Sequence, residues 1–188
     1  AGICFLHAPL FNPAMKNVAP VRKDLGVKTF FNMLGPMVNP SRPSKQMIGV
    51  YSLELARIYT YLYQNTDKDF VIVHSLDGYD EISLTGDFKI LTRDMEKIMQ
   101  PDELGLQQYN PGELSGGVSV ADAAKIFKSV LEGKGTQAQN EVVIANAGLG
   151  LKAYYPEKNI LECVGLARES LESGKANSAL NTLIDTNK

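Results

Sequence analysis

Three acidic side chains lie within five positions, directly after a continuous apolar run. The run Phe70 to His74 reads Phe-Val-Ile-Val-His, and Asp77, Asp80 and Glu81 follow it. Such a run is typical of a strand covered on both faces, and open α/β sheets bind ligands beyond the carboxyl ends of their strands. Carboxylates there can bind Mg²⁺, which takes one or two protein carboxylates and fills its other positions with water or phosphate oxygens. A solvated acidic turn is the alternative interpretation.

The adjacency of Asp80 and Glu81 restricts how they could bind one ion. Neighbouring side chains of a regular strand point to opposite faces. The two carboxylates can therefore share a metal ion only where the backbone is irregular. A metal site here predicts a bend at Asp80.

Arg22 is the second candidate binding residue. A guanidinium offers a planar pair of donors that matches a carboxylate in a bidentate way, so Arg22 could bind a small acidic molecule. The alternative is a surface arginine near a helix, flanked by Lys23 and Asp24.

The histidines and cysteines give no further catalytic or metal-binding pattern. His7 and His74 stand alone in apolar surroundings and are predicted to be packed histidines rather than catalysts. Cys4 and Cys163 lie far apart, without a Cys or His at metal-ligand spacing, so neither a zinc site nor a disulfide framework is expected. A cytoplasmic location is the prediction.

The composition is that of an ordinary globular chain. Its 188 residues, 44% of them hydrophobic and 21% charged, predict one α/β domain over residues 1–188. A formal net charge of −2 provides no positive excess to hold a polyanion, so nucleic acid is not expected as a partner. No apolar run approaches the roughly 20 residues of a membrane span, so no membrane partner is expected.

The elements that must position the acids alternate between strand and helix. Strands are predicted at 46–50 and 70–74, with a helix from Ser52 to about Gln64 between them, which indicates a parallel pair with a right-handed crossover. Short strands at 82–84, 88–91 and 97–99 are expected to form an antiparallel edge. The predicted fold class is α/β, with a mostly parallel sheet that has an antiparallel edge and is flanked by helices.

The C-terminal third is predicted to be helical. A helix capped by Ser119 should stop at Gly133 and turn its apolar side chains inward: Ala123, Ile126, Phe127 and Val130. Further helices are expected at 136–151, at 156–174 and around Leu180, Leu183 and Ile184.

Several short sequence blocks, taken in their order along the chain, resemble those of the anthranilate phosphoribosyltransferase family, and the resemblance covers almost the whole chain. The resemblance rests on Val21-Arg22, on Phe31-Asn32-Met33-Leu34-Gly35-Pro36 with Asn39-Pro40, and on Asp77-Gly78-Tyr79-Asp80-Glu81. Each block is unspecific alone, and their order is specific. The resemblance implies Mg²⁺-dependent transfer of a phosphoribosyl group from phosphoribosyl pyrophosphate to the amine of anthranilate, in tryptophan biosynthesis.

The resemblance also implies roles for single residues. Arg22 takes the position of the family's ligand for the anthranilate carboxylate. Asp80 and Glu81 take the positions of its metal-binding acid pair, which serves Mg²⁺ on the pyrophosphate side. The parent protein is expected to be a homodimer.

Two parts of the family pattern are expected upstream of residue 1: the glycine-rich loop that binds phosphoribosyl pyrophosphate and the small N-terminal helical domain. We therefore expect a fragment that holds half of an active site and is inactive alone. His7, Asn12 and Met15 lie near the expected anthranilate entrance without assigned roles. The alternatives are an enzyme similar to a pyrimidine-nucleoside phosphorylase and a non-catalytic interaction module.

Overall fold

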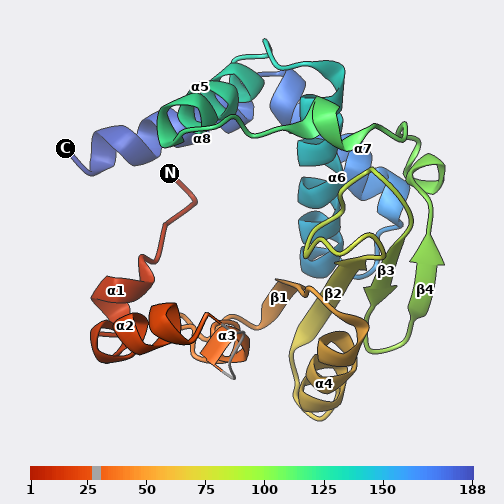
Figure 1. Cartoon of the computed structure of the whole chain (residues 1–188). Helices are drawn as coiled ribbons and strands as arrows, with labels where there is room; N and C mark the ends of the chain where they lie inside the picture. The colour runs from red at the N-terminus through yellow and green to blue at the C-terminus, as the bar shows by residue number, and fades with distance from the viewer. Residues whose placement is uncertain (27–30) are drawn as a thin grey trace.

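The computed structural model describes residues 1–26 and 31–188, apart from five side chains within those ranges: Pro9, Met15, Arg22, Lys23 and Phe31. Three N-terminal helices precede a sheet, and four helices follow it (Figure 1). The elements in chain order are α1 (Ala8–Phe11), α2 (Met15–Leu25), α3 (Phe31–Leu34), β1 (Lys45–Gly49), α4 (Leu53–Tyr63), β2 (Asp69–Ser75), β3 (Phe88–Leu91), β4 (Glu96–Met99), the 3-10 turns η1 (Pro101–Leu104) and η2 (Pro111–Leu114), α5 (Val120–Leu131), α6 (Gln137–Tyr154), α7 (Ile160–Glu172) and α8 (Lys175–Thr186).

The four strands form one sheet in the order β1-β2-β3-β4. β1 and β2 are parallel, with Ile48 opposite Ile72, whereas β2–β3 and β3–β4 are antiparallel. The predicted α/β class and parallel pair are confirmed. Antiparallel pairings are nevertheless the larger part of the described sheet, because the chain returns as a hairpin after β2. The strand predicted at 82–84 is wrong, since those residues belong to the irregular segment 76–87.

β2 is apolar throughout because both of its faces are buried. Phe70 and Ile72 pack with the apolar side of α4, whereas Val71 and Val73 lie in a second core formed with α6 and α7. Figure 1 shows α4 and α6 on opposite sides of the sheet. Burying a side chain of this size contributes about 1.5–3 kcal/mol, so the strand that leads to the acidic segment is firmly fixed.

Short polar side chains determine where several helices begin. Ser52, Ser119, Thr136 and Asn159 each accept a hydrogen bond from the backbone N–H three residues later. A cap of this kind satisfies a donor at the open end of the helix. The predicted starts at Ser52 and Ser119 are confirmed, while the helix predicted from residue 156 begins at Ile160, because Asn159 is its cap.

The inward orientation predicted for part of α5 is wrong. Val130 is buried, but Ala123 is exposed and Phe127 is 54% exposed. The physical reason is the position of α5: it packs beside α8, away from the sheet (Figure 1), so most of its apolar side does not reach the core. No helix within the described ranges is long and apolar enough to cross a membrane.

Candidate active site

The acidic segment lies against the end of β1. An added Cβ at Gly49, the last residue of β1, would lie 1.8 Å from the carbonyl oxygen of Asp80 and 2.9 Å from its carbonyl carbon. No side chain fits in that space, so Gly49 permits the close approach of the two backbones. Because β1 and β2 are parallel, Asp80 lies at the edge of the sheet where both of these strands end.

The backbone bends at Asp80 and Glu81, which confirms the predicted irregularity. The bend brings the two carboxyl groups together. Partial burial is the largest of three effects that raise the pKa of Glu81 to about 7; a side-chain hydrogen bond with Asp80 and the negative charge of Asp80 are the others. Glu81 as a residue remains exposed, so this burial is confined to the surroundings of its carboxyl group. A cation placed between the two carboxyl groups would offset the repulsion between their charges.

Asp77 does not join the pair. Its carboxylate accepts hydrogen bonds from Ser83 Oγ at 3.3 Å and from the hydroxyl of Thr85. Among the described residues no group of three or more His, Cys, Asp or Glu side chains is arranged to hold a metal ion. Two carboxylates nevertheless fit Mg²⁺, because water and phosphate oxygens commonly complete its coordination.

Ser75, the last residue of β2, holds the backbone that follows the acidic bend. Its Oγ donates to the carbonyl oxygen of Glu81 at 2.5 Å and accepts from the backbone N–H of Ser83 at 3.1 Å. Ser75 and Gly49 are not among the residues predicted from the sequence. A glycine at the end of a strand signals close backbone approach and could have indicated Gly49; a single serine at a strand end carries no comparable signal.

Of the other candidate residues, the two histidines and Asn12 have described side chains. His74 is 6% exposed, and its Nδ1 lies 2.8 Å from the carbonyl oxygen of Val50, as expected of a packed histidine. His7 is exposed, so the prediction that it is packed is wrong: it precedes α1 in the N-terminal segment, which lies apart from the core (Figure 1). Arg22 lies in α2, and its side chain, like that of Met15, is outside the described part. Asn12 is half-buried.

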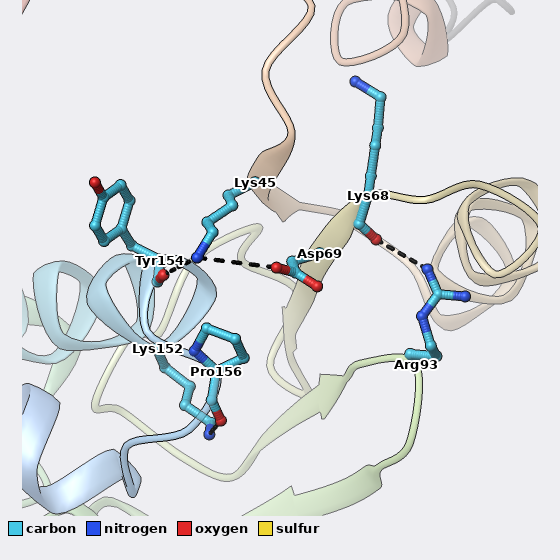
Figure 2. A network of polar contacts seen from close by, with 7 residues as sticks. All are labelled: Lys45, Lys68, Asp69, Arg93, Lys152, Tyr154 and Pro156. Atoms are coloured by element: carbon cyan, nitrogen blue, oxygen red, sulfur yellow. Dashed lines mark hydrogen bonds and ion pairs between the residues drawn. The ribbon is translucent and has the colours of Figure 1, made fainter.

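The opposite end of the sheet has a structural role (Figure 2). A cavity of about 290 Å³ lies there, lined by several residues that include Asp69, Arg93 and Lys152. Arg93 donates to the carbonyl oxygens of residues 64, 66 and 68 at 2.6–3.0 Å, and Lys152 donates to those of residues 156 and 158 at 2.6 Å. These cations fix the ends of α4 and α6.

Comparison with known proteins agrees with this architecture. Residues 1–177 match the model of the glycosyl transferase family, a/b domain. The chain belongs to this family. It is similar to the anthranilate phosphoribosyltransferase of Cytophaga hutchinsonii, with 54% identity over 176 residues that cover 94% of this chain and 54% of the relative.

Two solved structures of family relatives match the fold. The anthranilate phosphoribosyltransferase from Saccharomyces cerevisiae in complex with PRPP and Mg has a TM-score of 0.87 and 29% identity, over 96% of this chain and 52% of that one. The yeast enzyme in complex with 4-fluoroanthranilate has a TM-score of 0.87 and 28% identity, over 97% and 54%. The chain spans about half the length of the curated relatives it matches.

Proposed function

We propose that the full-length protein transfers a phosphoribosyl group from phosphoribosyl pyrophosphate to the amine of anthranilate, giving N-(5-phosphoribosyl)anthranilate and pyrophosphate in tryptophan biosynthesis. The observation that carries this proposal is the acid pair: Asp80 and Glu81 meet in a bend beyond the carboxyl ends of β1 and β2. The yeast complexes with PRPP and Mg and with 4-fluoroanthranilate support the substrates and the metal.

The reaction forms a bond between the anthranilate nitrogen and carbon 1 of the ribose, and it breaks the bond from that carbon to pyrophosphate. The amine nitrogen loses one proton to solvent. Asp80 and Glu81 would hold Mg²⁺, and the ion would supply positive charge to offset the negative charge that grows on the departing pyrophosphate. An aromatic amine is nucleophilic when neutral, so the acid pair need not serve as a strong general base.

Arg22 supplies the second half of substrate recognition in this proposal. Its guanidinium binds the carboxylate of anthranilate in a bidentate way. Arg22→Lys should raise KM for anthranilate while leaving KM for phosphoribosyl pyrophosphate near its original value, because a lysine cannot reproduce the planar pair of donors. Equal effects on both KM values would contradict the assignment.

The acid pair is tested by substitution in the full-length protein. Asp80→Asn and Glu81→Gln should each lower kcat/KM about 100-fold, by the loss of preorganised charge at the metal. Asp94→Asn is the matched control: Asp94 is an exposed carboxylate in the turn between β3 and β4, and its loss should change kcat/KM less than twofold. Phosphorolysis of pyrimidine nucleosides without anthranilate turnover would overturn the proposal in favour of a phosphorylase.

We further propose that residues 1–188 form one domain holding half of the active site, with the loop that binds phosphoribosyl pyrophosphate outside them, in a cytoplasmic homodimer. Isothermal titration with Mg²⁺-pyrophosphate and, separately, with anthranilate tests the divided site. Binding by the full-length protein and not by residues 1–188 is expected. Tight binding of both ligands, or turnover, by residues 1–188 alone would refute the division.

A further inference from the structure

A side chain from α6 holds the segment that carries the acid pair. Asn146 lies 64 residues downstream of Ile82, and its Oδ1 accepts a hydrogen bond from the Ile82 backbone N–H at 3.0 Å. Its Nδ2 donates to the Ile82 carbonyl oxygen at 2.8 Å. These are the two bonds that a residue of a neighbouring antiparallel strand exchanges with its partner. One amide side chain thus replaces a strand at the residue directly after Glu81.

Asn146 and Ser75 together hold the two peptide units that follow Glu81. In the first unit, the Glu81 carbonyl oxygen accepts from Ser75 and the Ile82 N–H donates to Asn146. In the second, the Ile82 carbonyl oxygen accepts from Asn146 and the Ser83 N–H donates to Ser75. Every backbone donor and acceptor of these two units is therefore satisfied by a side chain, although the segment lies outside the sheet.

The position of Asn146 is itself well determined. Its Nδ2 also donates to the carbonyl oxygen of Val142, one turn earlier in α6, at 2.9 Å. α6 packs directly on β1 and β2, so the amide is fixed relative to the strands whose ends form the site. Ile82 is fully buried, and without Asn146 its two polar backbone groups would lose their hydrogen-bond partner. The segment would have to move to satisfy them.

We propose that Asn146 is a positioning residue for metal binding: it fixes the backbone next to Glu81 so that the Asp80 and Glu81 carboxylates converge on one divalent cation. The inference rests on the proposed function, in which these acids hold Mg²⁺. Asn146 does not touch the ion or the substrates. Its effect is on the geometry of the carboxylates, because a displacement of about 1 Å at an active site can cost on the order of 100-fold in rate.

The test compares Asn146→Ala with Asn181→Ala in the full-length protein. Asn181 is an exposed residue within α8, so the control makes the same chemical change on a helix far along the chain from the acids. Titration with Mn²⁺-pyrophosphate should give a Kd at least tenfold weaker for Asn146→Ala and within twofold of the parent for Asn181→Ala. The KM for Mg²⁺ should rise by a similar factor, with kcat largely recovered at saturating Mg²⁺.

A merely structural role gives a different pattern. It would lower the melting temperature of Asn146→Ala while the folded protein kept the parental Kd for Mn²⁺-pyrophosphate, and that result would overturn the inference. Asn146→Asp serves if the alanine variant does not fold. Its carboxylate keeps an acceptor for the Ile82 N–H, but it loses the donor to the Ile82 carbonyl oxygen and places a negative charge against that oxygen. This variant should also weaken Mn²⁺-pyrophosphate binding tenfold or more.

Failure of the proposed function remains distinguishable. A parent protein that binds Mn²⁺-pyrophosphate, loses this binding on Asn146→Ala and yet does not convert anthranilate would refute the reaction and support the positioning role. A parent protein that binds no Mn²⁺-pyrophosphate would refute both.

Discussion

Gly49→Ala is expected to disable the candidate site while introducing a single methyl group. The added Cβ would lie 1.8 Å from the carbonyl oxygen of Asp80, whereas ordinary van der Waals contact begins at 3.4 Å. The obstacle is backbone on both sides, so relief requires β1 and the acidic segment to separate by about 1.6 Å, at a cost in the free energy of unfolding of about 1–3 kcal/mol.

The functional effect should exceed the loss of stability. A shift of this size moves the Asp80 carboxylate by more than the roughly 1 Å that can cost on the order of 100-fold in rate. We therefore expect kcat/KM of the full-length protein to fall at least about 100-fold, with a weaker Kd for Mn²⁺-pyrophosphate, at temperatures where the variant is fully folded.

The assay measures anthranilate consumption against Mg²⁺ concentration, alongside thermal unfolding. Gly165→Ala is the matched control, since Gly165 lies inside α7 and an added Cβ meets no atom within 4 Å. This control should keep full activity and gain about 0.5–1 kcal/mol, because alanine is the better helix former. A folded Gly49→Ala protein with kcat/KM within threefold of the parent would refute the close approach of Gly49 and Asp80.

Three further predictions concern stability. The pKa of Glu81 rises from 4.5 to about 7 on folding, so the free energy of unfolding falls as pH rises between these values. Without metal, Glu81→Gln should therefore be about 1 kcal/mol more stable than the parent at pH 8, a figure discounted for solvent screening. At pH 4 the two proteins should be equally stable in thermal melts. Burial raises the pKa of Glu141, but the hydrogen bonds from the Gln107 N–H and from Gln137 contribute to a net lowering of that pKa. Glu141→Gln should cost about 1–3 kcal/mol at pH 7 in urea unfolding, and the difference should shrink as pH falls below 4.5. Gly148→Ala places a Cβ 2.8–3.1 Å from side-chain and backbone atoms of Val164. The helices α6 and α7 would have to separate, which should lower the free energy of unfolding by about 1–3 kcal/mol. An unchanged melting temperature would contradict this close packing.

Local patterns predicted most of the framework around the site. The apolar run at 70–74, the Ser52 cap and the period of the following helix correctly predicted β2, α4 and a parallel pair, because each signal lies within a few residues. The strand expected at 82–84 failed because alternation of apolar and polar residues does not reveal which partner satisfies the backbone. At Ile82 that partner is a side chain far along the chain, not a strand.

The acids of the proposed site stand out in the sequence, whereas the residues that support them do not. Carboxylates after a buried strand are a local pattern, and the family resemblance singled out Asp80 and Glu81 among them. Asn146 is a single polar residue in an apolar stretch of α6, and nothing near it in the sequence indicates that it meets residue 82. Leu84 was equally unpredictable: it is fully buried with a φ of 57°, which only the packing of the whole core can impose on a leucine.

The hydrogen bonds between Ile82 and Asn146 also determine when, during synthesis of the chain, the acidic segment can become ordered. A ribosome synthesises residue 82 first and reaches residue 146 about 3–13 s later, at ordinary rates of elongation. During that interval the acids exist in a nascent chain without the amide that holds their backbone. In the proposed site, competence to bind metal thus requires that α6 has been synthesised, and stalled nascent chains that end before α6 are expected to carry both carboxylates in an unorganised segment.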